Sequence, residues 1–393
     1  MSELMFSTRF YWGLEQNRLT QLLQAKRRAG ADILDLTESN PTRAGLDYPS
    51  EILNAFADPR ILTYEPAPAG ITEAREAVAR YYMARGMQLP LERILLTAST
   101  SEAYTYLFKL LCDAGDEVLV PRPSYPLFEF LAGMESVKVR QYPLRYHGEW
   151  SIDMQALDAL LTDRTRAVIL VNPNNPTGSY VKRDELHELA RLCAARNMAL
   201  ISDEVFADYS LARTPGTVPM IAGFNECLAF SMSGLSKVAG LPQMKLGWIV
   251  ASGPHALRTE AMEKLEWIAD TYLSVSTPVQ CAAARLIEIG ETVQRQIRER
   301  TEANLRFARR ALAGTAANIL NVEAGWYIVL QVPRVLTEEE WTLSLLEQDD
   351  VLVQPGFFYD FESEAYLVLS LLTEPAIFRE GFTRIAPRWH TSS

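Results

Sequence analysis

Residues 231–248 read Ser231-Met-Ser-Gly-Leu-Ser-Lys237-Val-Ala-Gly-Leu-Pro-Gln-Met-Lys245-Leu-Gly247-Trp248. The stretch follows a short apolar run, 228–230, that is typical of the end of a buried strand. Lys237 stands among small and hydroxylated residues, which leave room for a flat ligand and offer hydroxyls to phosphate oxygens. Apolar surroundings lower the pKa of an amine and make it a nucleophile, so this lysine is suited to form a Schiff base. The alternative is an ordinary solvated loop lysine, and the rest of the chain has to decide between the two.

Strands and helices alternate in the region that precedes this stretch. An apolar, β-branched run at 167–171 predicts a central parallel strand that ends in Asn172-Pro-Asn-Asn175-Pro-Thr-Gly178. A helical segment, 183–196, leads to a second strand, 198–202, which ends in Asp203-Glu204. This alternation of strands and helices predicts an α/β fold with a doubly wound, mostly parallel sheet. Ligands of such folds bind beyond the carboxyl ends of the strands.

Polar and aromatic residues lie at several of the places where such a fold binds ligands. A strand over 94–97 runs into the hydroxyl cluster 99–101 before a helix, which predicts either an anion site at the helix N-terminus or a plain N-cap. Tyr125 belongs to a rigid proline loop, so its ring either stacks on a heterocycle or closes an edge of the core. Asp203 is suited to pair with a protonated ring nitrogen, and the alternative is a helix N-cap or an exposed carboxylate.

Two loops near the start of the chain carry further candidates. Glu38-Ser-Asn40-Pro-Thr42 either lines a ligand site, with Asn40 as its substrate-binding residue, or only turns the chain. Tyr64 precedes the rigid loop 65–70 and from there either reaches a neighbouring site or packs locally.

Composition and charge exclude several classes of protein. The 393 residues, 48% of them hydrophobic, provide a large core, and a net charge of −11 argues against nucleic acid as a partner. No run reaches the roughly eighteen apolar residues that span a bilayer, and the start lacks a signal layout, so we expect a cytoplasmic protein that binds no membrane. The four cysteines are scattered without paired spacing, so neither a disulfide framework nor a metal site is expected. From Pro254 onward long charged helices precede short strands, which predicts a separate, smaller α+β unit.

The motifs occur in a fixed order along the chain: a hydroxyl cluster, a stacking aromatic, Asn-Asn-Pro-Thr-Gly, a strand-end Asp-Glu, and Ser-Gly-Leu-Ser-Lys with a second lysine eight residues on. Together they resemble the fold-type I pyridoxal-phosphate enzymes, in particular the class I/II aminotransferases, over nearly the whole chain. The Ser-Gly-Leu-Ser-Lys form is most similar to the alanine and aromatic aminotransferase branches. The resemblance implies the PLP-dependent transferase fold type I, with a large cofactor domain over 45–285 and a small domain built from 1–44 and 286–393. It also implies a homodimer with shared active sites.

The resemblance further implies a role for each candidate residue. Lys237 would form the internal aldimine with pyridoxal 5'-phosphate and later move a proton, while Asp203 would keep the pyridine nitrogen protonated. Asn175 would bind the 3-oxygen of the ring, and Tyr125 would stack on its face. Tyr64 would reach in from the partner subunit. The phosphate would be held by Ser99, Thr100, Ser101, Ser233 and Ser236.

Three positions depart from the family pattern. Phe206 stands where a tyrosine usually donates to the 3-oxygen, and Lys245 replaces a phosphate-binding arginine, which keeps the charge without the two-pronged geometry. Val368 stands where an arginine usually grips the substrate α-carboxylate, which is a strong contact to lose. Either Arg384, Arg388 or an N-terminal arginine supplies this clamp, or the substrate has no ordinary α-carboxylate.

The sequence therefore predicts a PLP-dependent aminotransferase that moves an amino group between an amino acid or amine and a 2-oxo acid. One alternative is a PLP-dependent lyase or decarboxylase that acts on a modified amino acid. Another is a non-catalytic binding module on the same fold, such as the effector-sensing part of a transcription regulator. The acidic charge balance and the absence of a basic DNA-binding segment from this sequence argue against the binding module.

Overall fold

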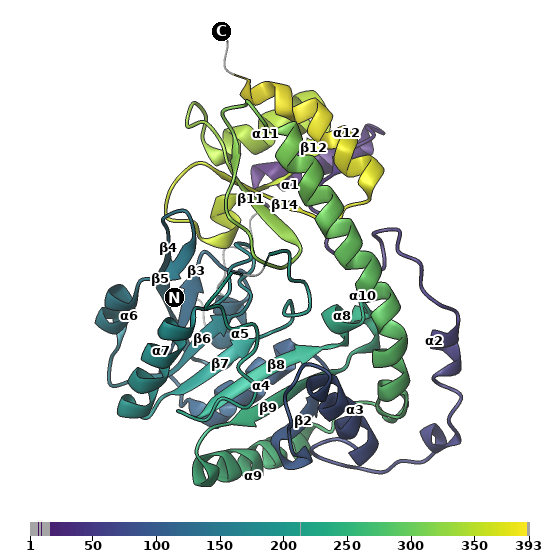
Figure 1. Ribbon diagram of the computed structural model, residues 1–393, viewed down its shortest axis with the longest axis vertical. Helices are drawn as coiled ribbons and strands as arrows, with labels where there is room; N and C mark the ends of the chain where they lie inside the picture. The colour runs from purple at the N-terminus through teal and green to yellow at the C-terminus, as the bar shows by residue number, and fades with distance from the viewer. Residues whose placement is uncertain (1–6, 8, 10–15, 213, 391–393) are drawn as a thin grey trace.

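The computed structural model describes residues 7, 9, 16–212 and 214–390, which form one large and one small sheet with their helices (Figure 1). The large sheet has the strand order β2-β9-β8-β7-β6-β3-β4-β5. Its strands are β2 (Ile94–Thr97), β3 (Glu117–Arg122), β4 (Lys138–Tyr146), β5 (Trp150–Ile152), β6 (Thr165–Val171), β7 (Ala199–Asp203), β8 (Ala229–Gly234) and β9 (Gly247–Ser252). The inner strands β8, β7, β6, β3 and β4 are parallel, whereas β9 and β5 run opposite to their neighbours. The predicted α/β class with a mostly parallel sheet is confirmed.

The central strands β3, β6 and β7 carry apolar side chains on both faces because helices cover both faces of the sheet. In β3, Val118 and Val120 contact one helical layer, and Leu119 between them contacts the opposite one. Such alternation follows from the two-residue period of a strand. The first layer contains α4 (Thr100–Leu111), α5 (Phe128–Met134) and α9 (His255–Tyr272), and the second contains α6 (Met154–Leu160), α7 (Arg183–Arg196) and α3 (Thr72–Met83).

Capping residues fix where the helix α7 begins and ends. The Glu185 carboxylate accepts the backbone N–H of Lys182 at 2.8 Å and thereby satisfies a donor at the start of the helix. Asn197 ends the helix in a left-handed conformation with φ 52°. The two caps fix both ends of α7. The chain then continues into β7, which places Asp203 at the carboxyl-end edge of the sheet.

The small sheet is antiparallel and has the strand order β10-β11-β14-β13. It consists of β10 (Asn318–Ile319), β11 (Tyr327–Gln331), β13 (Gln354–Pro355) and β14 (Tyr366–Ser370). Around it lie α1 (Arg18–Arg28), α11 (Glu338–Asp349) and α12 (Pro375–Ile385), and β1 (Leu34–Asp35) pairs in parallel with β12 (Val351–Leu352). The predicted smaller α+β unit is thus present, and it contains α1 and the end of the described chain (Figure 1).

One long helix, α10 (Thr277–Ala311), links the two sheets. Its 35 residues span about 50 Å at 1.5 Å per residue. Near its start Val279 and Leu286 pack beside the large sheet, and near its end Leu305 and Ala308 pack in the core of the small one. Residue 285 lies inside this helix, so the boundary at 285 divides a continuous element, and the domain limits stay a prediction.

Within the described ranges, none of the helices combines the length and the apolar composition required to cross a bilayer. In the same part of the chain, no three His, Cys, Asp or Glu side chains are grouped as metal ligands would be.

Candidate active site

A cavity of about 200 Å³ lies beyond the carboxyl ends of β6 and β7, beside the start of α4 and of the short helix α8 (Leu235–Val238). The sequence-predicted residues Thr100, Ser101, Tyr125, Asn175, Asp203, Phe206, Ser236 and Lys237 all line it. Its other lining residues are Ser39, Tyr104, Leu127, Phe128, Leu131, Val171, Val205 and Tyr327. The fold thus brings together segments that are up to about 290 positions apart in the sequence (Ser39 to Tyr327), as expected for a site at the carboxyl-end edge of an α/β sheet.

Lys237 has the environment of a reactive amine. Burial lowers the pKa of its ammonium to about 8, an effect that the nearby carboxylate of Asp203 opposes. Its Nζ lies 5.6 Å from the ring centre of Phe206 and 4.9 Å from that of Trp326. The Tyr209 hydroxyl donates to the backbone carbonyl of Lys237 and anchors its main chain. A lysine held in this way is partly unprotonated near neutral pH, which makes it a nucleophile.

Asp203 ends β7 and carries the second charge of the cavity. Its Oδ1 accepts the Val205 backbone N–H at 3.2 Å, and its Oδ2 accepts the Tyr104 hydroxyl at 3.2 Å. Burial raises its pKa to about 6, while these two hydrogen bonds and Lys237 lower it. The neighbouring Glu204 instead accepts the Ile221 backbone N–H at 2.7 Å and the Ser231 hydroxyl at 3.1 Å, so it ties strands together outside the cavity.

Asn175 is held in place by the loop that follows β6. Its side chain is buried, and among the described residues its Oδ1 has no hydrogen-bond partner. The loop is fastened to the small-sheet side, because the backbone N–H groups of Glu323 and Ala324 donate to Gly178 O at 3.1 and 2.8 Å. Gly178 has φ +69°, and a Cβ there would lie 2.3 Å from Ala324 O, so the motif needs glycine at this position.

The hydroxyl cluster divides between an N-cap and the lining of the cavity. The Ser99 hydroxyl accepts the Glu102 backbone N–H at 3.2 Å and caps α4, and it does not line the cavity. Thr100 and Ser101 do line the cavity, at the N-terminus of a twelve-residue helix whose dipole favours anions. Ser233 is buried in β8 outside the cavity, and its hydroxyl has no partner among the described residues.

Besides Ser99 and Ser233, four predicted residues lie away from the cavity. Tyr64 is 74% exposed, and Lys245 is exposed as well. The Asn40 side chain accepts the Thr42 backbone N–H at 3.1 Å, whereas its neighbour Ser39 lines the cavity. Val368 is fully buried in the small sheet among Trp150, Leu320, Val329 and Tyr359.

The lining contains one lysine and one aspartate and, among the described residues, no arginine. Arg384 bonds to Glu380 and to the carbonyl of Asp349, and Arg388 bonds to Gln348 and Ser344. Both arginines are therefore engaged against α11 and do not reach the cavity.

Sequence reasoning did not assign roles to several residues that the fold places at or beside the site. Tyr104 carried a usable signal, because it follows Thr100 by one helical turn and must share its face of α4. Trp326 and Tyr327 carried no such signal, because both come from the small sheet. Tyr327 is the first residue of β11, and Trp326 precedes it.

The arrangement fits a phosphorylated pyridine aldehyde such as pyridoxal 5'-phosphate. An amine that is readily deprotonated, a desolvated carboxylate, the buried side-chain amide of Asn175 and a helix N-terminus with two hydroxyls face one space. These groups match an aldehyde, a protonated ring nitrogen, a ring oxygen and a phosphate, respectively.

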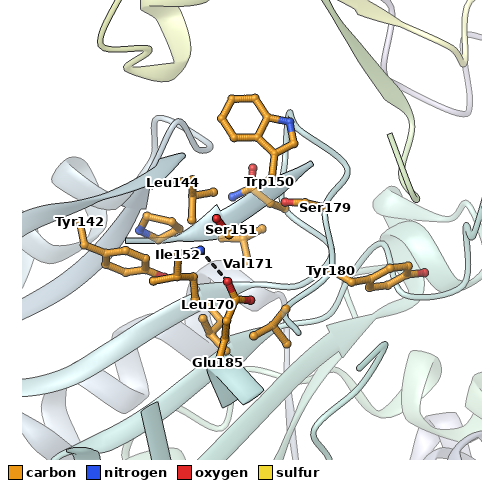
Figure 2. A pocket seen from close by; sticks show the side chains of 13 residues that line it. Tyr142, Leu144, Trp150, Ser151, Ile152, Leu170, Val171, Ser179, Tyr180 and Glu185 are labelled. Atoms are coloured by element: carbon orange, nitrogen blue, oxygen red, sulfur yellow. Dashed lines mark hydrogen bonds between the residues drawn. The ribbon is translucent and has the colours of Figure 1, made fainter. Parts of the chain in front are cut away.

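A second space between β4, β5 and β6 is too small for such a molecule (Figure 2). Its volume is about 30 Å³, which holds one or two waters. Glu185 reaches it from α7 and accepts the Ile152 backbone N–H at 2.7 Å (Figure 2). Val171 lines both spaces, so this one lies directly behind the larger cavity.

Comparisons with known proteins agree with the site. A sequence model of the family "Aminotransferase class I and II" matches residues 31–376. The glutamate-pyruvate aminotransferase AlaA of Escherichia coli K12 is 31% identical over 268 residues, which are 66% of this chain and 65% of that protein. The S-alkyl-thiohydroximate lyase SUR1 of Arabidopsis thaliana is 28% identical over 265 residues, 65% of this chain and 57% of that protein. The alanine aminotransferase structure from Pyrococcus furiosus has a TM-score of 0.84 at 22% identity and covers 94% of this chain and 95% of that one, which shows the same fold.

Proposed function

The chain belongs to the class I and II aminotransferase family, and from this premise we propose that it transfers an amino group between an amino acid or amine and a 2-oxo acid. The observation that carries the proposal is the pairing of Lys237, whose pKa is lowered to about 8, with the buried Asp203 in one cavity. A binding module would have no use for a deprotonated amine beside a buried carboxylate, because both are unfavourable unless they perform chemistry.

We propose pyridoxal 5'-phosphate as the cofactor, which when bound supplies a ring that withdraws electrons from the reacting carbon. The Lys237 amine would hold its aldehyde and later accept and return a proton. Asp203 would hold the proton of the ring nitrogen, and the Asn175 amide would donate to the 3-oxygen. Tyr125 would cover one face of the ring. The phosphate would bind to the hydroxyls of Thr100, Ser101 and Ser236, which line the cavity.

Phe206 cannot donate to the 3-oxygen, which leaves Asn175 as the proposed donor to that oxygen. The Phe206 ring is nevertheless well fixed, because it packs edge-on against Trp326 at 5.2 Å between ring centres. It therefore contributes a wall beside Lys237 that keeps water away from the amine and helps to lower its pKa.

The group that binds the substrate carboxylate remains to be assigned. A buried carboxylate without a cation is costly by several kcal/mol, and Lys237 is the one cation among the described lining residues. Two alternatives follow from this charge balance. Either an arginine outside this lining, from the N-terminal segment or a partner subunit, completes the site, or the amino donor has no α-carboxylate.

We propose a homodimer in which Tyr64 approaches the cavity of the partner. Leu62, Tyr64 and Trp267 are 87%, 74% and 81% exposed, which is unusual for large apolar side chains in a free monomer. Tyr64 and Leu273, next to the end of α9, line one groove, so these two side chains lie on one face. A second copy that covers this face would remove them from water.

We also propose a cytoplasmic location. The cysteines Cys112, Cys193, Cys227 and Cys281 are all free thiols, which is typical of proteins in a reducing compartment.

A spectral titration tests the proposed reaction. The protein is loaded with pyridoxal 5'-phosphate and mixed with amino acids and their decarboxylated amines, while absorbance follows conversion of the cofactor from its aldehyde to its amine form. Conversion by amino acids alone means that a carboxylate-binding group completes the site, and conversion by amines means that the donor needs none. The Lys237→Ala variant should convert slower by about 10²- to 10⁴-fold, since proton transfer by a placed base contributes that much.

Two results of the titration would contradict the aminotransferase proposal. One is a bound cofactor that no donor converts to the amine form. The other is release of ammonia and an eliminated group with the aldehyde form retained, which would identify a lyase instead.

A further inference from the structure

Among the described residues, Tyr104 makes the one side-chain hydrogen bond to Asp203. It belongs to α4, is 3% exposed and lines the cavity. Its hydroxyl donates to Oδ2 of Asp203 at 3.2 Å, while Oδ1 accepts the Val205 backbone N–H. Each carboxylate oxygen thus has a fixed donor from a different element, which sets the plane of the carboxyl group.

The Tyr104 ring is held firmly enough to orient its partner. It packs edge-on against Phe128 at 5.5 Å and lies 5.9 Å from Phe108, both measured between ring centres. The phenol cannot leave Asp203 without leaving its hydroxyl unpaired in apolar surroundings, which is unfavourable.

The carboxylate of Asp203 can accept more hydrogen bonds than the two from Tyr104 and Val205. An ionised carboxylate offers about four lone-pair sites, so it can accept a further N–H on the cavity side. A hydrogen bond from a neutral phenol stabilises the ionised form, whereas burial alone favours the protonated one. A protonated carboxyl group would itself be a donor and could not accept the N–H of a pyridinium ring.

We propose that Tyr104 is a positioning residue that orients Asp203 and keeps it ionised for the protonated ring nitrogen of the cofactor. The inference rests on the proposed function, because it assumes that Asp203 faces that nitrogen.

Binding measurements without turnover test the inference. Protein freed of cofactor is titrated with pyridoxal 5'-phosphate and with its analogue that has C–H in place of the ring nitrogen, and tryptophan fluorescence gives the dissociation constants. Tyr104→Phe should weaken binding of pyridoxal 5'-phosphate by at least about tenfold, as expected for one hydrogen bond to a charged group, and change binding of the analogue less than about twofold.

Tyr106→Phe is the matched control. It makes the same change in the same helix, where the Tyr106 hydroxyl lies 3.3 Å from that of Ser274 and is equally buried. Both ligands should bind to this variant as to the parent protein. A thermal unfolding scan of each variant verifies that it is folded.

A double-mutant cycle separates orientation from packing. If Tyr104 acts through Asp203, Tyr104→Phe should have no further effect on pyridoxal 5'-phosphate binding in an Asp203→Asn background. Equal weakening for both ligands, or an unchanged dissociation constant in Tyr104→Phe, would overturn the inference and leave the proposed function intact. A parent protein that binds both ligands equally would instead refute the role of Asp203 itself.

Discussion

At the scale of single residues, the reactivity of the site depends on how the cavity shifts the pKa values of two oppositely charged groups. Burial disfavours both the ammonium of Lys237 and the carboxylate of Asp203, and it lowers the pKa of the first while it raises that of the second. Each charge partly offsets the shift of the other, so both groups change protonation at moderate pH. This is the behaviour expected of groups that exchange protons with a substrate.

The reactivity of Lys237 should follow its lowered pKa. Only the unprotonated amine attacks an aldehyde, so capture of an aldehyde by Lys237, trapped by borohydride reduction, should rise through a midpoint near pH 8. The rate is measured against pH, and mass spectrometry locates the modified lysine. A midpoint near 10.5, the ordinary value for lysine, would show that the cavity does not perturb the amine.

At the scale of elements, the loop after β6 connects the site to the other sheet. The carbonyl of Gly178 accepts two backbone N–H groups from residues 323 and 324, so the loop that presents Asn175 is held from outside its own sheet. The small sheet therefore helps to shape the cavity even where it does not line it.

Substitution of Gly178 should show how closely these elements approach. In Gly178→Ala, the new Cβ would lie 2.3 Å from a backbone oxygen, so the free energy of unfolding should fall by more than about 2 kcal/mol. Gly30→Ala is the matched control, because Gly30 has a similar φ of +77° with nothing within 4 Å of the added Cβ, and it should lose only about 1 kcal/mol. Urea denaturation measures both, and equal losses would mean that backbone strain alone explains the effect.

At the scale of the whole molecule, two carboxylates on the small-sheet side bind cations of the large-sheet side. Glu323 accepts Lys182 Nζ at 2.9 Å and also the Tyr180 backbone N–H. Glu362 bridges Arg122 and Arg145. The Glu323 side chain is 2% exposed and that of Glu362 is 33% exposed, so solvent screens the second pair far more than the first.

The two carboxylates should therefore contribute unequally to stability. Glu323→Gln leaves Lys182 with only Glu149 at 3.9 Å and should reduce the free energy of unfolding by about 2–4 kcal/mol. Glu362→Gln should cost less than about 1 kcal/mol despite its two arginines. Denaturant titration compares them, and a larger loss for Glu362→Gln would contradict the argument from burial.

The proposed dimer should depend on the exposed apolar face. Trp267→Asp places a charge at an 81% exposed position, so it should leave the fold of a monomer intact while it weakens association by at least about tenfold if a partner buries that side chain. Sedimentation velocity over a range of concentrations gives the association constant. Leu257→Asp, at a 51% exposed position near the opposite end of α9, is the control, and equal effects of both changes would point to a different interface.

The sequence alone was sufficient for the class of fold and for the residues that carry charge or hydroxyls in local motifs. Four site residues could be found because each lies at or after the end of a strand whose apolar pattern can be recognised in the sequence: Lys237, Asp203, Asn175 and Thr100. Parallel strands bring such ends to one edge of the sheet. Tertiary structure alone decided what surrounds them. Trp326 and Tyr327 arrive from another sheet, Tyr104 finds Asp203 across 99 positions of sequence, and the arginines at 384 and 388 are engaged elsewhere. The reason is physical: periodicity reports which face of an element is buried, whereas the packing of distant elements determines which side chains meet there and how strongly each charge is desolvated.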